Sequence, residues 1–169
     1  MTEGRAKGAK EAKDFNTRMN SNDAEVERVG RAVLDAAFHV HTVLGPGLLE
    51  SVYEAALAFE LSRRGLRVER QVPIPVIYEG QRMEVGFRAD LIVEGKVLIE
   101  LKSVGTVTPM FKKITTNYLK LIPLKLGFLI NFNELHLKDG ITRVVNGIEG
   151  KSFFPPSPPS SPSRDPAFA

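Results

Sequence analysis

An acidic residue and a lysine stand two positions apart where an apolar segment ends. Glu100 and Lys102 follow the run Val97-Leu98-Ile99, and residues two apart on a strand point to the same face of a sheet. The tripeptide Glu-x-Lys occurs four times in the chain, but only this copy ends an apolar segment. Charged groups at the end of a core strand are costly unless they are paired or bind a ligand. The pair therefore indicates either a salt bridge at a sheet end or part of a reactive site.

A second acid, Asp90, lies inside the strand predicted before this one. Aspartate is disfavoured in strands, so its presence needs a reason. A two-residue loop at 94–95 would pair Asp90 with Ile99. A three-residue loop would instead pair Asp90 with Leu98 and place it diagonal to Glu100 on one face. That second register would create a two-carboxylate site for a hard metal ion, with a lysine beside it.

A third acid stands near the start of a predicted helix. Glu50 lies beside the apolar stripe of that helix and shares a helix flank with Tyr53, in the string Gly47-x-x-Glu50-x-x-Tyr53. By itself, Glu50 would be a partly exposed helix acid. Glu54, one turn further on, is expected to face solvent.

The apolar spacing predicts the elements that must hold these side chains. Valines and alanines recur every three or four residues after position 24, which is the period of an amphipathic helix. The predicted elements are helices over 24–43, about 47–65 and 109–122, and strands over 68–78, 83–93, 97–102, 127–132 and 141–145. The mostly apolar strand 127–132 should lie inside the sheet. Three strands, a helix crossover and further strands predict an α/β fold with a mixed central β-sheet flanked by helices.

Composition restricts the classes of function. The 169 residues are 43% hydrophobic and 25% charged, as in globular proteins, and no apolar run is long enough to span a membrane. The chain has no cysteine, which excludes disulfides, thiolate metal sites and cysteine nucleophiles. With three histidines, a metal would be held by carboxylates, which favours a hard ion such as magnesium. No apolar leader is visible, so we expect a cytoplasmic protein.

The two ends differ from the stretch between them. Residues 1–20 are rich in lysine, glycine and alanine, and we predict a disordered basic tail. Residues 151–169 are rich in proline and serine, and we predict a second disordered tail. The domain then spans 21–150. The formal net charge of +3 falls on the two tails and leaves 21–150 neutral, so any nucleic-acid surface must be a local patch.

Several motifs follow one another in a recognisable order. They are His41, Gly47-x-x-Glu50-x-x-Tyr53, Asp90, Glu100-x-Lys102, Asn117-Tyr118-Leu119-Lys120 and the strand 127–132. As a set, they resemble the GxxExxY family over about 24–148. The resemblance implies a PD-(D/E)XK nuclease-like, or restriction-endonuclease-like, fold. Its core is a helix, three strands, a helix and a strand (α-β-β-β-α-β), here with an extra N-terminal helix.

The resemblance also implies an active site. Carried over by position, its residues are Glu50, Asp90, Glu100 and Lys102. Asp90, Glu100 and the backbone carbonyl of Leu101 would hold magnesium or manganese, with Glu50 bound directly or through water. Such an ion polarises a phosphodiester and lowers the pKa of a bound water. Lys102 would position that water or offset charge on the phosphate.

Lysines on the third predicted helix are candidates for contacts with nucleic-acid phosphates. They are Lys112, Lys113 and Lys120; the alternative is a solvated helix face. Family members often carry a glutamine, with a histidine slightly upstream, on this helix. The present chain has Ile114 and Phe111 at those positions.

Two functions from different classes fit these observations. The first is a magnesium-dependent nuclease that cuts phosphodiester bonds of nucleic acid, and the presence of all four active-site residues favours it. The second is a nuclease-fold module that binds nucleic acid or a protein partner without cutting. The neutral stretch 21–150 and the departures at Phe111 and Ile114 favour the second.

Overall fold

Strands and helices follow one another in the order that the sequence predicts. The computed structural model describes residues 3–146. Within them the elements are α1 (Glu3–Leu44), α2 (Glu50–Arg63), β1 (Val68–Tyr78), β2 (Gln81–Val93), β3 (Val97–Lys102), α3 (Pro109–Leu121), β4 (Leu126–Asn131), the 3-10 helix η1 (Leu137–Gly140) and β5 (Ile141–Val145). The predicted segments are confirmed to within a few residues, except at the start of α1.

The strands form one five-stranded sheet whose spatial order follows the chain, β1-β2-β3-β4-β5. β3 and β4 are parallel, and the other neighbouring pairs are antiparallel. A parallel pair needs a crossover connection, which α3 supplies. All residues of these two strands except Lys102 are buried. The interior position predicted for the strand 127–132 and the mixed α/β class are therefore confirmed.

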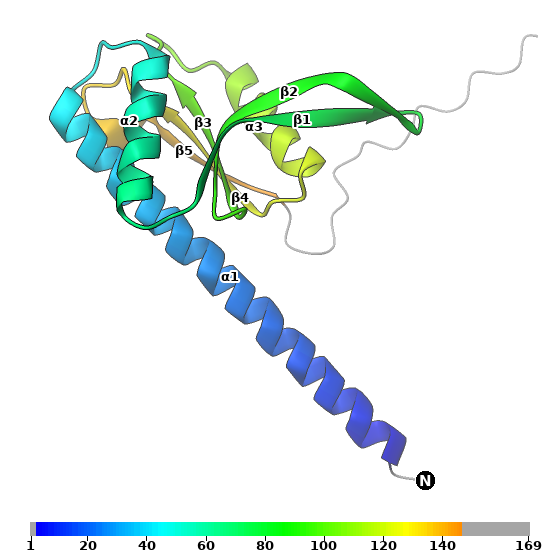
Figure 1. Cartoon of the computed structure of the whole chain (residues 1–169). Coiled ribbons are helices and arrows are strands. Elements are labelled where there is room, and N and C mark those ends of the chain that lie inside the picture. The colour runs from blue at the N-terminus through cyan, green and yellow to red at the C-terminus, as the bar shows by residue number, and fades with distance from the viewer. Residues whose placement is uncertain (1–2, 147–169) are drawn as a thin grey trace, which may run out of the picture.

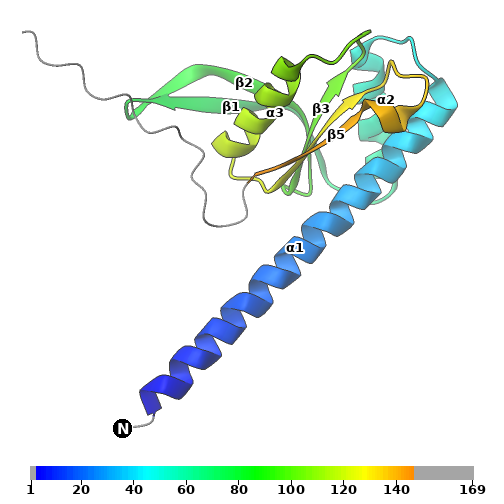
Figure 2. The same ribbon diagram turned by 180° about the vertical axis from the view of Figure 1, so that it is seen from behind.

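Helices cover the two faces of the sheet. α1 and α2 pack on one face and α3 packs on the other (Figures 1 and 2). Val29 and Val33 of α1 are fully buried in the core. Gly30 stands beside them because a Cβ there would come within 2.8 Å of Cδ2 of Leu126 on β4. The glycine therefore lets α1 approach the sheet closely, which explains its place inside a helix.

α1 is longer than the sequence predicts. It begins at Glu3 rather than near residue 24, and its N-terminal half extends away from the sheet (Figures 1 and 2). Our prediction used the spacing of buried apolar residues, which starts at Val26, and a helix rich in alanine, lysine and glutamate leaves no such pattern. The structure thus has residues 3–20 in α1, where we expected a disordered tail; the tail 151–169 lies outside the described residues. Despite the length of α1, no described helix is apolar enough to cross a membrane.

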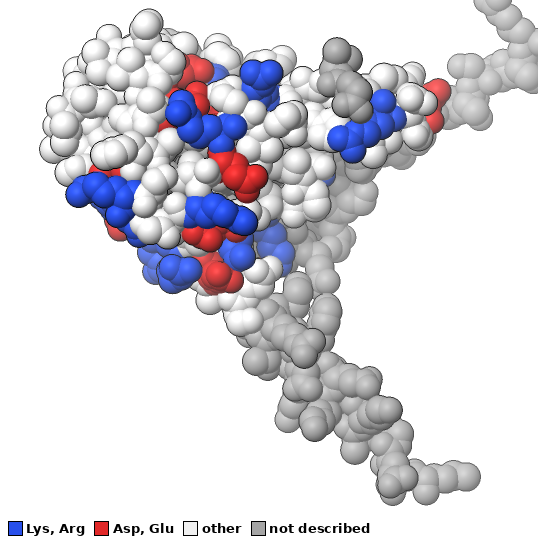
Figure 3. Space-filling view, viewed as in Figure 1, with Lys and Arg blue, Asp and Glu red and all other residues white. Residues whose placement is uncertain are grey.

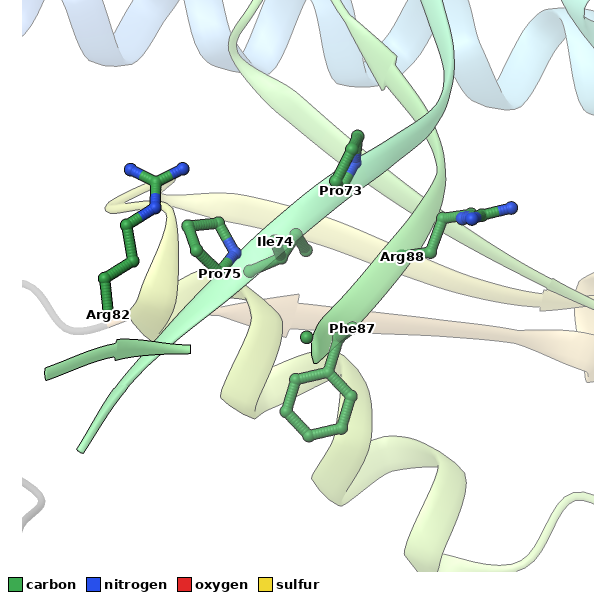
Figure 4. Close-up of a pocket in the computed structure, with 7 residues that line it drawn as sticks. Pro73, Ile74, Pro75, Arg82, Phe87 and Arg88 are labelled. Carbon is green, nitrogen blue, oxygen red and sulfur yellow. The ribbon is translucent and has the colours of Figure 1, made fainter. Parts of the chain in front are cut away.

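β1 and β2 form a hairpin that extends beyond the rest of the sheet as a two-stranded arm (Figures 1 and 2). β2 pairs with β3 only from Leu91 to Val93, whereas its pairing with β1 continues to the turn. The register slips between Ile74 and Val76, and a Cβ on Gly86 would collide there with the Ile74 carbonyl oxygen. A cavity of about 240 Å³ opens at this point (Figure 4), lined by Pro73, Ile74, Pro75, Arg82, Gly86, Phe87 and Arg88. This lining includes none of the four predicted active-site residues.

Candidate active site

The hairpin between β2 and β3 has a register that differs from both predicted registers. The paired residues are Leu91–Ile99, Ile92–Leu98 and Val93–Val97. Both predicted registers, with Asp90 paired to Ile99 or to Leu98, are therefore wrong. Continued by one step, the observed register sets Asp90 opposite Glu100 rather than diagonal to it. Directly opposite residues share a face of the sheet, so the two acids still lie on one side.

The turn explains this register. Glu94 and Gly95 both have positive φ, 54° and 61°, and the N–H of Lys96 donates to the carbonyl of Val93 at 2.9 Å. Lys96 closes the turn but lies outside the ladder, so β3 begins to pair one residue later than in a plain two-residue hairpin. Tight turns with positive φ at both central residues favour asparagine or aspartate before glycine. Glu94 is not one of these residues, so the residue types do not predict this turn.

Asp90 is held by hydrogen bonds from both neighbouring strands. Its Oδ2 accepts the N–H of Leu101 on β3 at 2.7 Å, and its Oδ1 accepts Nε2 of Gln71 on β1 at 3.3 Å. Burial raises the pKa of Asp90, although the Leu101 hydrogen bond and the charge of Lys102 oppose the rise. A carboxyl group perturbed by burial and by specific partners is a candidate functional residue.

One carboxylate oxygen of Glu100 is buried without a hydrogen-bond partner among the described residues. The residue is 7% exposed; its Oε1 accepts Nζ of Lys102 at 2.9 Å, but its buried Oε2 has no hydrogen-bond partner among the described residues. Burial, followed by the negative charge of Asp90, raises the pKa of Glu100 to about 7, and Lys102 opposes the rise. A buried carboxylate oxygen without a partner needs an explanation. A cation shared by Glu100 and Asp90 would supply one.

Lys102 connects Glu100 on β3 to Glu50 on α2. Its Nζ donates to Glu100 at 2.9 Å and to the carbonyl oxygen of Leu101 at 2.5 Å, and it lies 3.5 Å from Oε1 of Glu50. The same Nζ is 5.5 Å from the centre of the Phe111 ring, a distance that permits a cation–π contact. Burial acts to lower the pKa of Lys102, but the charges of the surrounding acids outweigh it, and the net shift is upward. Lys102 is therefore a fixed positive charge at the end of β3.

Tyr53 helps to position Glu50, because its hydroxyl group holds the loop that precedes α2. The tyrosine is fully buried; its hydroxyl donates to the carbonyl of Gly45 at 2.6 Å and accepts the N–H of Leu48 at 3.1 Å. These bonds fasten the loop before α2 to the first turns of the helix. α2 begins at Glu50, somewhat later than predicted, so Glu50 stands at the helix start and reaches Lys102.

Replacing Gly47 with alanine should lower the free energy of unfolding by about 1–2 kcal/mol. Gly47 has a φ of +94°, and left-handed backbone costs residues with a Cβ about that much. The space around the position is open, so the cost is conformational rather than steric. Urea denaturation measures it, with Gly105→Ala as the control, because Gly105 has open space and no positive φ. Equal stability of wild type and Gly47→Ala would contradict this role of the motif glycine.

Three further residues join the site that the sequence analysis did not select. Glu54, which we expected to face solvent, is 8% exposed. Its Oε1 accepts Nε of Arg70 at 2.9 Å, and its Oε2 accepts Nε2 of Gln71 at 2.7 Å. A signal was available for Glu54, since residues four apart on a helix are neighbours and Glu50 was already placed toward the site. Nothing in the spacing of β1 pointed to Arg70 or Gln71.

The lysines predicted to meet phosphates lie along α3. Lys112 and Lys113 are exposed in its first turn, and Lys120 is partly buried in its last turn. The ring of Phe111 brings the N-terminal end of α3 next to Lys102. On the face shown in Figure 3, lysine and arginine side chains lie beside acidic ones, in agreement with the neutral charge of the stretch between the tails. The phosphate contacts of these lysines stay a prediction.

The oxygen donors at the end of β3 suit a magnesium-type ion. Asp90 and Glu100 offer carboxylates, and one buried oxygen of Glu100 accepts no hydrogen bond from the residues described. Among residues 3–146, no group of three or more histidine, cysteine, aspartate and glutamate side chains is arranged to hold a metal ion. Magnesium is commonly bound by one or two carboxylates and keeps several waters. Two carboxylates are therefore sufficient for the donor set to fit.

A comparison with family models decides which group of proteins this site belongs to. The model of the PD-(D/E)XK nuclease superfamily matches residues 27–144. The chain belongs to this superfamily. The match lies within the predicted domain, runs from α1 to β5 and includes all four predicted active-site residues, and the restriction-endonuclease-like fold is confirmed with it. No curated protein and no solved structure matches the chain. Membership of the narrower GxxExxY family stays a prediction.

Proposed function

We propose that this protein is a metal-dependent nuclease that hydrolyses phosphodiester bonds of nucleic acid. The observation that supports the proposal most directly is the buried Oε2 of Glu100, which accepts no hydrogen bond from the described residues and belongs to an acid facing Asp90. Two close carboxylates repel each other when both are ionised, and a divalent cation would relieve that repulsion. Membership of a nuclease superfamily supports phosphodiester hydrolysis as the reaction.

Asp90 and Glu100 would hold the ion, which we take to be magnesium or manganese, and Glu50 would contact it directly or through water. When bound, such an ion polarises a phosphodiester and lowers the pKa of a coordinated water. The Leu101 carbonyl accepts Nζ of Lys102, but a carbonyl oxygen has two lone pairs, so the same oxygen would still have one lone pair for the ion. Lys102, whose Nζ lies at Glu100 and Leu101, would donate to the attacking water or to a phosphate oxygen.

Nucleic acid would approach along the N-terminal end of α3. Lys112 and Lys113 are exposed there, one and two residues after Phe111, whose ring lies near Lys102. Lysines that neutralise phosphates release counterions, so binding should weaken as salt increases. Lys120 would contribute a weaker contact from the last turn.

Magnesium or manganese should stabilise the wild-type protein by about 1–3 kcal/mol at roughly 10–100 times the Kd. Asp90→Asn should abolish this stabilisation, because it removes one of the two carboxylate charges. Thermal melts with and without metal, followed by incubation with mixed nucleic acids, measure binding and cleavage separately. Asp139→Asn is the control, since Asp139 lies in η1 and not at the end of β3. A wild type that gains no stability from either metal and cuts no nucleic acid would contradict the proposal.

The second candidate function is a module that binds nucleic acid without cutting it. Phe111 favours this candidate, because it occupies the helix position where the family often carries a histidine and packs its ring near Lys102. In that case nucleic acid should bind in a salt-dependent manner, and Lys112→Ala with Lys113→Ala should reduce the salt dependence. No product should form with either metal.

A further inference from the structure

The side chain of Gln71 connects two acids that lie on different elements. Its Nε2 donates to Oε2 of Glu54 on α2 at 2.7 Å and to Oδ1 of Asp90 on β2 at 3.3 Å. The flanking pairs Arg70–Leu91 and Val72–Ala89 set Gln71 across from Asp90 in the β1–β2 ladder. A primary amide has two hydrogens to donate, so one side chain can serve both carboxylates.

We propose that Gln71 is a positioning residue, whose amide, anchored by Glu54, fixes the orientation of the Asp90 carboxylate toward Glu100. The inference deepens the proposed function and rests on it, because its subject is the binding of the cation by Asp90. Oδ2 of Asp90 accepts one hydrogen bond from Leu101, and Oδ1 accepts one from Gln71. An ionised carboxylate accepts about four hydrogen bonds or ligands, so lone pairs are left for a metal ion.

The backbone at Gln71 supports a functional rather than an incidental contact. Gln71 has a φ of +50°, which is rare for a residue other than glycine, asparagine or aspartate. The position is not a turn, because Arg70 and Val72 on either side are both paired with β2. Strained backbone persists where the surroundings hold it, and such positions cluster at active sites and ligand clamps.

Glu54 is the anchor of this arrangement. It is 8% exposed, and Arg70 donates to its other oxygen at 2.9 Å. Both oxygens of Glu54 are thus engaged, one by a guanidinium and one by the Gln71 amide. A carboxylate with these partners is suited to hold Gln71 in place. Because both of its oxygens already accept hydrogen bonds, we assign Glu54 to the support of Gln71 and not to the ligands of the ion.

Gln71→Gly should separate positioning from structural support. Glycine adopts positive φ without strain, which offsets the hydrogen bond that the buried Glu54 loses, so the melting temperature of the metal-free protein should change little. The affinity for manganese, measured by calorimetry, should fall by tenfold or more, which is the usual effect of losing a group that orients a metal ligand. A residue with only a structural role would move stability and affinity in the same direction.

Two further variants complete the test. Gln71→Asn tolerates positive φ and keeps an amide, but its shorter side chain cannot span both carboxylates, so it should lose affinity to a similar degree. Glu79→Gly is the matched control, because Glu79 also has positive φ, 47°, and lies in the exposed β1–β2 turn; it should leave affinity unchanged.

The outcomes distinguish this inference from the proposed function. A wild type that binds no manganese contradicts the proposed function. A wild type that binds manganese while Gln71→Gly and Gln71→Asn bind equally tightly overturns only the role of Gln71. Loss of affinity accompanied by a large fall in the melting temperature of Gln71→Gly also overturns it, in favour of a structural role.

Discussion

Glu100→Gln should raise the free energy of unfolding of the metal-free protein by about 3 kcal/mol at pH 8 and by less than about 1 kcal/mol at pH 5. Burial and the charge of Asp90 raise the pKa of Glu100 from 4.5 to about 7, and one pKa unit corresponds to about 1.4 kcal/mol. Glutamine has nearly the same shape as protonated glutamate and carries no charge to bury.

The direction of this pH dependence follows from where the proton is bound. Between pH 4.5 and about 7, the folded wild type keeps a proton on Glu100 that the unfolded chain has released. The folded state is therefore favoured at low pH, and the contribution of Glu100 to stability is lost as the pH rises through this window. The variant lacks this titration, so its advantage over the wild type should grow between pH 4.5 and 7 and then level off.

Urea denaturation of both proteins from pH 4.5 to pH 8, with a chelator present, measures this difference. Glu79→Gln serves as the control, because Glu79 lies exposed in the β1–β2 turn and its replacement should change stability little at any pH. A constant difference between Glu100→Gln and wild type across the range would contradict the assignment of a buried, proton-binding carboxyl to Glu100. Saturating magnesium should stabilise the wild type but not the variant.

Lys102→Met should abolish detectable cleavage while metal binding is retained. The methionine keeps most of the apolar stem near Phe111 but removes Nζ, which now contacts Glu100, Leu101 and Glu50. Removing one group that stabilises charge in a transition state typically lowers a rate by about 10²–10³-fold. The affinity for manganese should be equal or higher, since a positive charge that competes for the Glu100 carboxylate has been removed.

Single-turnover cleavage assays and manganese calorimetry on the same preparations test this pair of expectations. Lys138→Met is the control, because Lys138 is exposed in η1 and its replacement should alter neither quantity. Unchanged cleavage by Lys102→Met would remove Lys102 from the chemistry. Parallel loss of metal binding and cleavage would instead assign Lys102 to the integrity of the site.

Some features of the site follow from local periodicity alone. Alternation along a strand sets Glu100 and Lys102 on one face whatever the strand packs against, and the ion pair at 2.9 Å agrees with that. The helix spacing of Glu50 and Tyr53 is local in the same sense. The order of the elements also follows from apolar spacing, because each helix and strand buries its own face. These parts of the site can be predicted from residue spacing.

Which positions of β2 and β3 lie opposite each other cannot be predicted from residue spacing. The register of β2 on β3 depends on the positive φ of Glu94 and on the extra residue Lys96, and neither has a signature in residue spacing. A shift of one residue exchanges the partners along a hairpin, so the position of Asp90 relative to Glu100 was not determined by the pattern.

The contacts of Gln71 and Glu54 show the same limit. They join β1, α2 and β2, which are brought together by packing on the sheet rather than by proximity in the chain. The buried oxygen of Glu100 is likewise a property of what surrounds it. Periodicity assigns a side chain to a face of a helix or sheet. The residues that it contacts on that face depend on long-range packing, and these contacts determine the chemistry of the site.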